Sequence, residues 1–197
     1  MTGQHLLAGG SRAARIHTGE LALHVTFHAG HGPAVLLIHG IGSSGRGWEP
    51  VLDALSASFT PVTVDLRGHG SSDKPDRGYL YEDYIRDIDG LLRALGLDRP
   101  LMVGHSLGGI LALWWAARNP ERAAALVVED APLRSGEDFR PAFDGWLKLN
   151  ALPLPELRAY YASEHPEWPP EMVNARARDM AATTRAVFAE LREDSLA

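Results

Sequence analysis

The stretch LMVGHSLGG at residues 101–109 decides the fold, and the apolar run 110–117 follows it at once. Its first half has the composition of a short buried strand, and the run behind it that of a helix that is apolar on nearly every side. Between them stands G-x-S-x-G, the pattern of a tight strand-to-helix turn that presents a serine. Gly104 and Gly108 fit such a turn, because side chains two residues either side of the serine would collide.

Ser106 is therefore the predicted nucleophile. The turn lifts its hydroxyl clear of the sheet edge. It also leaves the N–H of Leu107 at a helix N-terminus, where unpaired donors and the helix dipole favour an oxyanion. The alternative is an ordinary serine in a glycine-rich turn, and the strand and helix on either side favour the nucleophile.

Composition limits the classes of function. The chain has 197 residues, 45% of them hydrophobic, and a net charge of -6, which suits one globular domain and argues against nucleic acid or an anionic membrane as partner. With no cysteine, disulfides, thiolate catalysis and Cys-based metal sites are excluded. No segment has the apolar length of a signal peptide or a bilayer span, so a cytoplasmic location is expected. The expected partner is a small-molecule substrate.

Strands and helices alternate along the chain after a loose lead-in at 1–12. Period-2 alternation over 21–28 predicts a half-buried strand, and continuous apolar runs predict strands covered on both faces. Those runs lie at 34–38, 61–66, 101–105 and 124–128, with helical spacing over 48–59, 84–95 and 110–117. This order predicts an α/β fold with a doubly wound, mostly parallel sheet. The loops 39–47, 65–75, 104–108 and 129–132 then share one sheet edge, where ligands bind.

The pattern changes after residue 132, which divides the chain into a core, 1–132, and a helical segment, 133–197. Aromatic residues there alternate with prolines, which predicts short, proline-broken helices and a final helix over about 171–192. The aromatic residues, Trp146 among them, either line an apolar substrate pocket or only hold the helices together.

Four segments carry a resemblance to a known family: HGIG at 39–42, DLRGHGSS at 65–72, GHSLGG at 104–109 and EDAP at 129–132. In this order and spacing the chain resembles the α/β-hydrolase family, from about Arg15 to its end. The resemblance implies an oxyanion hole made by the N–H groups of Leu107 and Ile41, and a helical cap at 133–197. Ile41, His105 and Trp146 are the residues expected to contact the substrate. Arg67 and His69 are expected to be scaffold.

A serine at the turn indicates the reaction type. Relatives that open epoxides or displace halide place a carboxylate there. An alcohol points to acyl transfer from an ester, thioester, lactone or activated C–C bond through an acyl-enzyme. No cofactor and no metal are expected, and His24 and His28 are interpreted as solvated strand histidines rather than a metal pair.

The acid and base are harder to place. The family's chain order is Ser, then Asp or Glu, then His. Asp130 at the end of its strand is the candidate acid, since the adjacent Glu129 points the other way in a regular strand. His165 is the one histidine after Ser106 and the candidate base. The usual positions of both groups lie beyond two further strands, so we expect a fragment that is nearly inactive alone and self-associates through the apolar edge at 124–130.

Two alternatives stay open. The residues GIGSSG at 40–45, with Asp65 20 residues beyond Gly45, match a dinucleotide-binding fingerprint, but the following helix starts too late to hold a pyrophosphate. A non-catalytic binding protein on a hydrolase scaffold is the second alternative, and labelling of Ser106 by a fluorophosphonate probe would separate it from an enzyme.

Overall fold

A computed structural model describes residues 11–133 and 138–194. The strands are β1 (Arg12–His17), β2 (Ala22–Phe27), β3 (Ala34–Ile38), β4 (Thr60–Val64), β5 (Leu101–His105) and β6 (Ala125–Glu129). The helices are η1 (Gly45–Trp48), α2 (Glu49–Ser56), α3 (Tyr81–Leu95), α4 (Leu107–Arg118), α5 (Arg140–Asn150), α6 (Leu154–Glu164), α7 (Pro170–Ala182) and α8 (Arg185–Asp194). None of the helices in the described part of the chain combines the length and the apolar composition that crossing a membrane requires.

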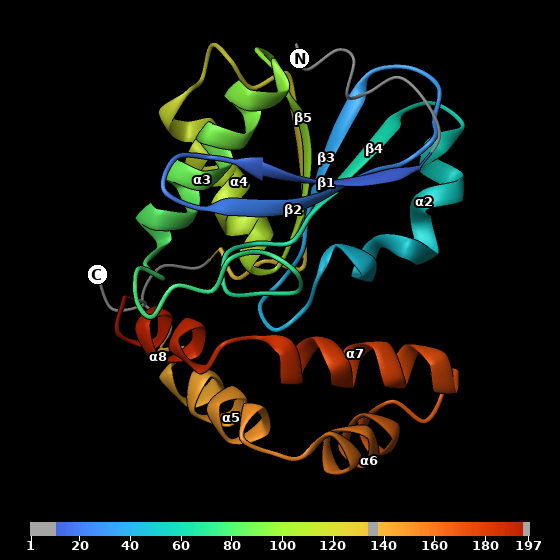
Figure 1. Cartoon of the computed structure of the whole chain (residues 1–197), viewed down its shortest axis with the longest axis vertical. Coiled ribbons are helices and arrows are strands. Elements are labelled where there is room, and N and C mark those ends of the chain that lie inside the picture. Colours follow the sequence, from blue (N-terminus) through green and yellow to red (C-terminus); the bar gives the residue numbers. More distant parts are fainter. Residues whose placement is uncertain (1–10, 134–137, 195–197) are drawn as a thin grey trace.

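The six strands form one sheet in the order β1-β2-β4-β3-β5-β6. Strand β3 runs parallel to β4 and β5, and β5 runs parallel to β6, while β1 and β2 are antiparallel. Figure 1 shows α3 and α4 on one face of the sheet and α2 on the other. The predicted α/β fold with a doubly wound, mostly parallel sheet is confirmed.

The apolar runs predicted as central strands are buried as expected. Leu36 and Ile38 of β3 and Val62 of β4 are inaccessible to solvent. Helix α3 ends at Gly96, which takes φ +67°, a left-handed conformation that only glycine adopts at no cost. The local sequence signals therefore placed the core elements correctly.

Strand β1 was missed by the sequence analysis, which placed residues up to 12 in a lead-in and gave no strand to 13–17. Its sequence, RAARIH, has one large apolar side chain, so it carries no clear period-2 signal. Antiparallel pairing with β2 forms it instead, because backbone hydrogen bonds need no apolar side chain. Residues 1–10 of the predicted lead-in lie outside the described part.

Strand β6 lies at the edge of the sheet and is not covered on both faces, contrary to the pattern of its sequence. It pairs with β5 on one side, and 56% of Val127 is exposed. An apolar run shows that a strand is suited to burial. The strand is buried only where other elements cover both of its faces.

Helices α5 to α8 form a layer, here called the helical layer, across one end of the sheet (Figure 1). Proline stands at the first or second position of α5, α6 and α7, where no helical hydrogen bond is lost. The predicted proline-broken helices are thus present. The predicted single helix over 171–192 is wrong, because it is two helices that meet at Thr183.

The break has a tertiary cause. Thr183 takes extended dihedral angles (φ −74°, ψ 130°), and the N–H of Thr184 donates to the carbonyl of Gly68 at 2.9 Å. The amide of Asn150 donates to the carbonyls of Met180 and Thr183, each at 2.9 Å. Partners outside the helix therefore replace the hydrogen bonds that a continuous helix would make.

Candidate active site

The turn after β5 has the geometry that its sequence predicts. Ser106 takes φ 49° and ψ −117°, and α4 begins at the next residue. A Cβ built on Gly104 would lie 2.3 Å from the carbonyl oxygen of Gly108, and one on Gly108 2.2 Å from that of Ile38. Both positions therefore require glycine, and the strained serine is held between them.

The backbone of Ser106 is fully bonded, which fixes the direction of its side chain. Its N–H donates to the carbonyl of Glu129 at 2.9 Å, and its carbonyl accepts from Gly109 at 2.9 Å and Ile110 at 3.1 Å. Among the described residues, no acceptor takes the N–H of Leu107. This donor at the start of α4 is thus free for a ligand.

The loop 39–42 passes directly beside the serine. A Cβ on Gly40 would lie 3.1 Å from Ser106 Cβ and 2.8 Å from His105 Nδ1. The neighbouring N–H of Ile41 likewise has no acceptor within 11–133 and 138–194. Two unbonded backbone donors therefore belong to residues close to the serine: Leu107 follows it, and Ile41 follows the Gly40 that lies beside it. His105 places its ring against this loop.

Two buried histidines fix the loop 39–42. The ring of His39 accepts from the N–H of Leu66 through Nε2 (3.0 Å) and bonds the carbonyl of Gly40 through Nδ1 (2.8 Å). His69 accepts from the N–H of Gly42 through Nε2 (3.1 Å). Burial lowers the pKa of His39 to about 4 and that of His69 well below its usual value. Both rings are neutral at pH 7, so each keeps the acceptor nitrogen that the loop needs. His69 was expected to be scaffold, and its contacts agree with that role.

Asp130 directly follows β6 and has a strained backbone of its own, at φ 42°. It and Ser106 are the two non-glycine residues with positive φ in the described part of the chain. They stand at the carboxyl ends of the neighbouring strands β5 and β6. Residues with strained backbone cluster at functional sites, so both are candidates for a role here.

The remaining predicted residues lie in the helical layer. His165 follows α6, where its ring stacks on Trp168 (centroids 3.7 Å apart) and Nδ1 lies 3.5 Å from an Oε1 of Glu167. Trp146 in α5 packs edge-to-face on Phe143 at 5.1 Å. The rings of His165 and Trp146 thus stack on or pack against other residues of the helical layer.

Helix α7 supplies residues that the sequence analysis did not select. Arg176 Nη1 donates to the carbonyl of Gly42, and Ser44 Oγ donates to Asp179 Oδ2 at 2.9 Å. Burial raises the pKa of Asp179 above its ordinary value. No local pattern in the sequence pairs residues some 135 positions apart, as these contacts do.

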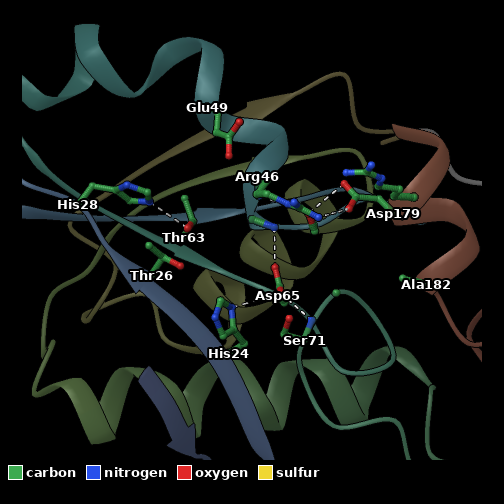
Figure 2. A pocket seen from close by; sticks show the side chains of 14 residues that line it. His24, Thr26, His28, Arg46, Glu49, Thr63, Asp65, Ser71, Asp179 and Ala182 are labelled. Carbon is green, nitrogen blue, oxygen red and sulfur yellow. Dashed lines mark hydrogen bonds and ion pairs between the residues drawn. The ribbon is translucent and has the colours of Figure 1, made fainter. Parts of the chain in front are cut away.

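A cavity of about 490 Å³ lies between residues of β2 and β4, the loop after β3 and the C-terminal part of α7 (Figure 2). Neither Ser106 nor Leu107 is among the described residues that line it. Asp65 at its floor accepts from the N–H of Gly45 at 2.7 Å and of Ser71 at 2.8 Å, and lies 3.3 Å from His24 Nδ1. In a dinucleotide-binding site the Asp65 carboxylate would accept from the ribose hydroxyls. Here backbone N–H groups bond that carboxylate instead.

The two strand histidines lie along the same cavity (Figure 2). His28 Nε2 bonds Thr63 Oγ1 at 3.1 Å. No cluster of three or more metal-ligating side chains occurs within the described ranges.

The helix start also bears on the dinucleotide alternative. The glycine-bearing loop is followed by η1 and then by α2, which begins only at Glu49, as the sequence analysis expected of a helix that starts too late to hold a pyrophosphate.

Comparisons with known proteins agree with this geometry. A family model described as alpha/beta hydrolase fold matches residues 33–193. A curated relative, 2-(acetamidomethylene)succinate hydrolase of Mesorhizobium japonicum, is 34% identical over 166 residues, which cover 83% of this chain and 59% of the relative. The crystal structure of E-2-(acetamidomethylene)succinate hydrolase superposes with a TM-score of 0.83 at 30% identity, covering 95% of this chain and 74% of that one.

A soluble epoxide hydrolase of Corynebacterium is also similar, at 33% identity over 114 residues, 56% of this chain and 40% of the relative. The chain thus spans about three-fifths or less of the length of these curated relatives.

Proposed function

The chain belongs to the alpha/beta hydrolase fold family, and on that premise we propose that it is a hydrolase whose nucleophile is Ser106. The observation that carries the proposal is the strained serine with two unbonded backbone N–H groups in the residues close to it, Leu107 and Ile41. The proposed substrate is a small molecule with an ester-like bond: a carboxylic ester, a thioester or a lactone.

The proposed reaction has two steps. Ser106 Oγ attacks the carbonyl carbon as a base takes its proton, and the leaving alcohol or thiol departs with a proton as the acyl-enzyme forms. Water then adds to the acyl-enzyme, and the acid and free serine result. The N–H groups of Ile41 and Leu107 would stabilise the oxyanion in both steps, each donor contributing about 10²–10³-fold in rate.

Asp130 is the proposed acid of the catalytic triad, supported by its position beside the serine strand and its strained backbone. His165 is the candidate base that the sequence predicts. For its ring to reach Ser106, it would have to leave Trp168 and Glu167. Substituting His165 therefore tests whether the helical layer takes part in the proton transfer.

The helical layer is proposed to act as a cap over the loops at the carboxyl ends of the strands, with Ile41, His105 and Trp146 as the residues that contact the substrate. The Mesorhizobium relative is named for an acetamido derivative of succinate. An amide of a small acid is therefore a further candidate for the cleaved group. The exposed edge of β6 is the proposed surface for self-association.

A fluorophosphonate probe tests this function directly, since only an activated serine reacts with it. Turnover by the chain alone is expected to be low, but the probe needs only one activated serine. We therefore expect it to label the full chain, to fail on Ser106→Ala, and to label Ser58→Ala, an exposed serine outside the site, like the unchanged protein. Asp130→Asn and His165→Ala report on the acid and the base by slower labelling. No labelling of the folded chain, or labelling that persists in Ser106→Ala, would contradict the proposal and favour a non-catalytic binding protein.

A further inference from the structure

Arg176 is held in a fixed position between the helical layer and the loop beside the nucleophile. Its Nη1 donates to the carbonyl of Gly42, the residue after the proposed oxyanion donor Ile41. Its Cζ lies 5.1 Å from the centre of the Tyr161 ring, a cation–π distance. The guanidinium thus bonds the loop through one of its five N–H groups and packs on an aromatic ring.

No carboxylate of the described residues forms an ion pair with Arg176. Other arginines are paired, such as Arg67, whose Nε lies 2.6 Å from Asp87. Asp179, one turn along α7, is close enough for the charge of Arg176 to act on its pKa, but its carboxylate accepts from Ser44 and lies 3.6 Å from Arg46. A half-buried guanidinium without a direct ion-pair partner is a natural partner for an anionic ligand.

The electrostatic effect of this charge reaches the loop 39–42. Burial is the largest cause of the lowered pKa of His39 and of His69, and the positive charge of Arg176 lowers the pKa of both further. The potential beside the nucleophile is therefore shifted in the direction that attracts an anion.

The hydroxyl of Tyr161 supports the same conclusion independently. Tyr161 is 5% exposed, and its hydroxyl has no hydrogen-bond partner in the part of the chain that the structure describes. Burial raises its pKa, so the hydroxyl keeps its proton. Buried polar groups are nearly always hydrogen-bonded, so this hydroxyl is a donor that a ligand acceptor would satisfy.

We propose that Arg176, with the Tyr161 hydroxyl, binds a carboxylate of the substrate, so that the substrate is a small carboxylic acid with its scissile acyl group a few bonds away. This inference rests on the proposed function, since Ser106 supplies the reacting atom. Gly40 lies beside Ser106, and the two residues from Gly40 to Gly42 span at most about 7 Å, so Arg176 bonds the loop close to the nucleophile. Guanidinium suits this task because it binds a carboxylate through two parallel N–H groups.

Binding to the full chain carrying Ser106→Ala tests the inference without turnover. Calorimetry would compare N-methylsuccinamate, which has one carboxylate and an unreactive amide, with the neutral N,N′-dimethylsuccinamide. We expect the anion to bind at least about tenfold more tightly, and the preference to disappear in Arg176→Gln. Arg178→Gln, an exposed arginine two residues along the same helix, is the matched control and should keep the preference. Tyr161→Phe should keep part of it.

Two further measurements separate the possible outcomes. Arg176→Lys keeps the charge but not the paired N–H groups, so it should retain a weakened preference, and circular dichroism would check that each variant folds. Equal affinity for the two ligands, or a preference that survives in folded Arg176→Gln, would overturn the inference. Failed fluorophosphonate labelling with the anion preference intact would instead overturn the proposed function and leave the binding site standing.

Discussion

Acid should destabilise this protein through a histidine that holds the loop beside the nucleophile. His39 is fully buried, and both ring nitrogens are bonded: Nε2 accepts from Leu66, and Nδ1 bonds the carbonyl of Gly40. A second proton would have to sit on Nε2, where it would face the Leu66 N–H. Burial accordingly lowers the pKa of His39 from 6.5 to about 4.

The sign and size of the effect follow from this pKa. Between pH 6.5 and 4 the unfolded chain binds a proton at His39 and the folded chain does not, so the free energy of unfolding falls as the pH falls. The stabilisation is complete above pH 6.5. One pKa unit corresponds to 1.36 kcal/mol, so the loss by pH 4 is about 3 kcal/mol. That is a large part of the 5–15 kcal/mol typical of a domain. His69 acts in the same direction.

Urea denaturation at pH 7, 6, 5 and 4 would measure this loss for the unchanged protein and for His39→Gln. The glutamine keeps an oxygen that is able to accept from Leu66 but does not titrate in this range. Burial raises the pKa of Asp87 and Asp179, which titrate with the opposite sign, and the comparison cancels them because both proteins carry them. We expect the unchanged protein to lose about 3 kcal/mol more than the variant. Parallel pH curves would refute the reasoning.

Three other predictions concern the turn, a buried ion pair and the sheet edge. Gly104→Ala places a Cβ 2.3 Å from the carbonyl of Gly108; unfolding experiments should show a loss of about 3 kcal/mol or more, and probe labelling should be lost. Arg67→Met leaves the buried Asp87 unpaired and should lower the free energy of unfolding by about 3–5 kcal/mol. Adding Asp87→Leu should restore most of the thermal stability. No recovery in the double variant would show that the ion pair itself stabilises the fold. Val127→Lys on the edge of β6 should lower self-association in sedimentation experiments with little change in Tm, and an unchanged association constant would exclude this edge as the contact.

Features with a local cause were predicted well from the sequence. Strand β5, the turn at Ser106 and α4 follow from neighbours in the chain, since two glycines and a change of periodicity define them. The end of α3 at Gly96 is equally local. The predicted strand over 21–28 and its inward side chains also agree with the structure.

The candidate site was predicted in part. Ser106, Leu107 and Ile41 lie where the motifs suggest, because two loops at the ends of adjacent parallel strands must meet at one edge. Arg176 and Tyr161 carried no signal, since their importance depends on α6 and α7 lying against a loop far away in the chain.

The sequence by itself determined which segments are strands and helices around the core, where the chain makes its strained turn, and which hydroxyl that turn presents. These depend on backbone preference and on side-chain periodicity, both properties of neighbouring residues. Only the tertiary structure decided that Arg12–His17 is a strand, that the last helix breaks at Thr183, and that two neutral histidines hold the loop beside Ser106. Each of these depends on hydrogen-bond partners that are distant in the chain, and such partners are chosen by packing rather than by local preference.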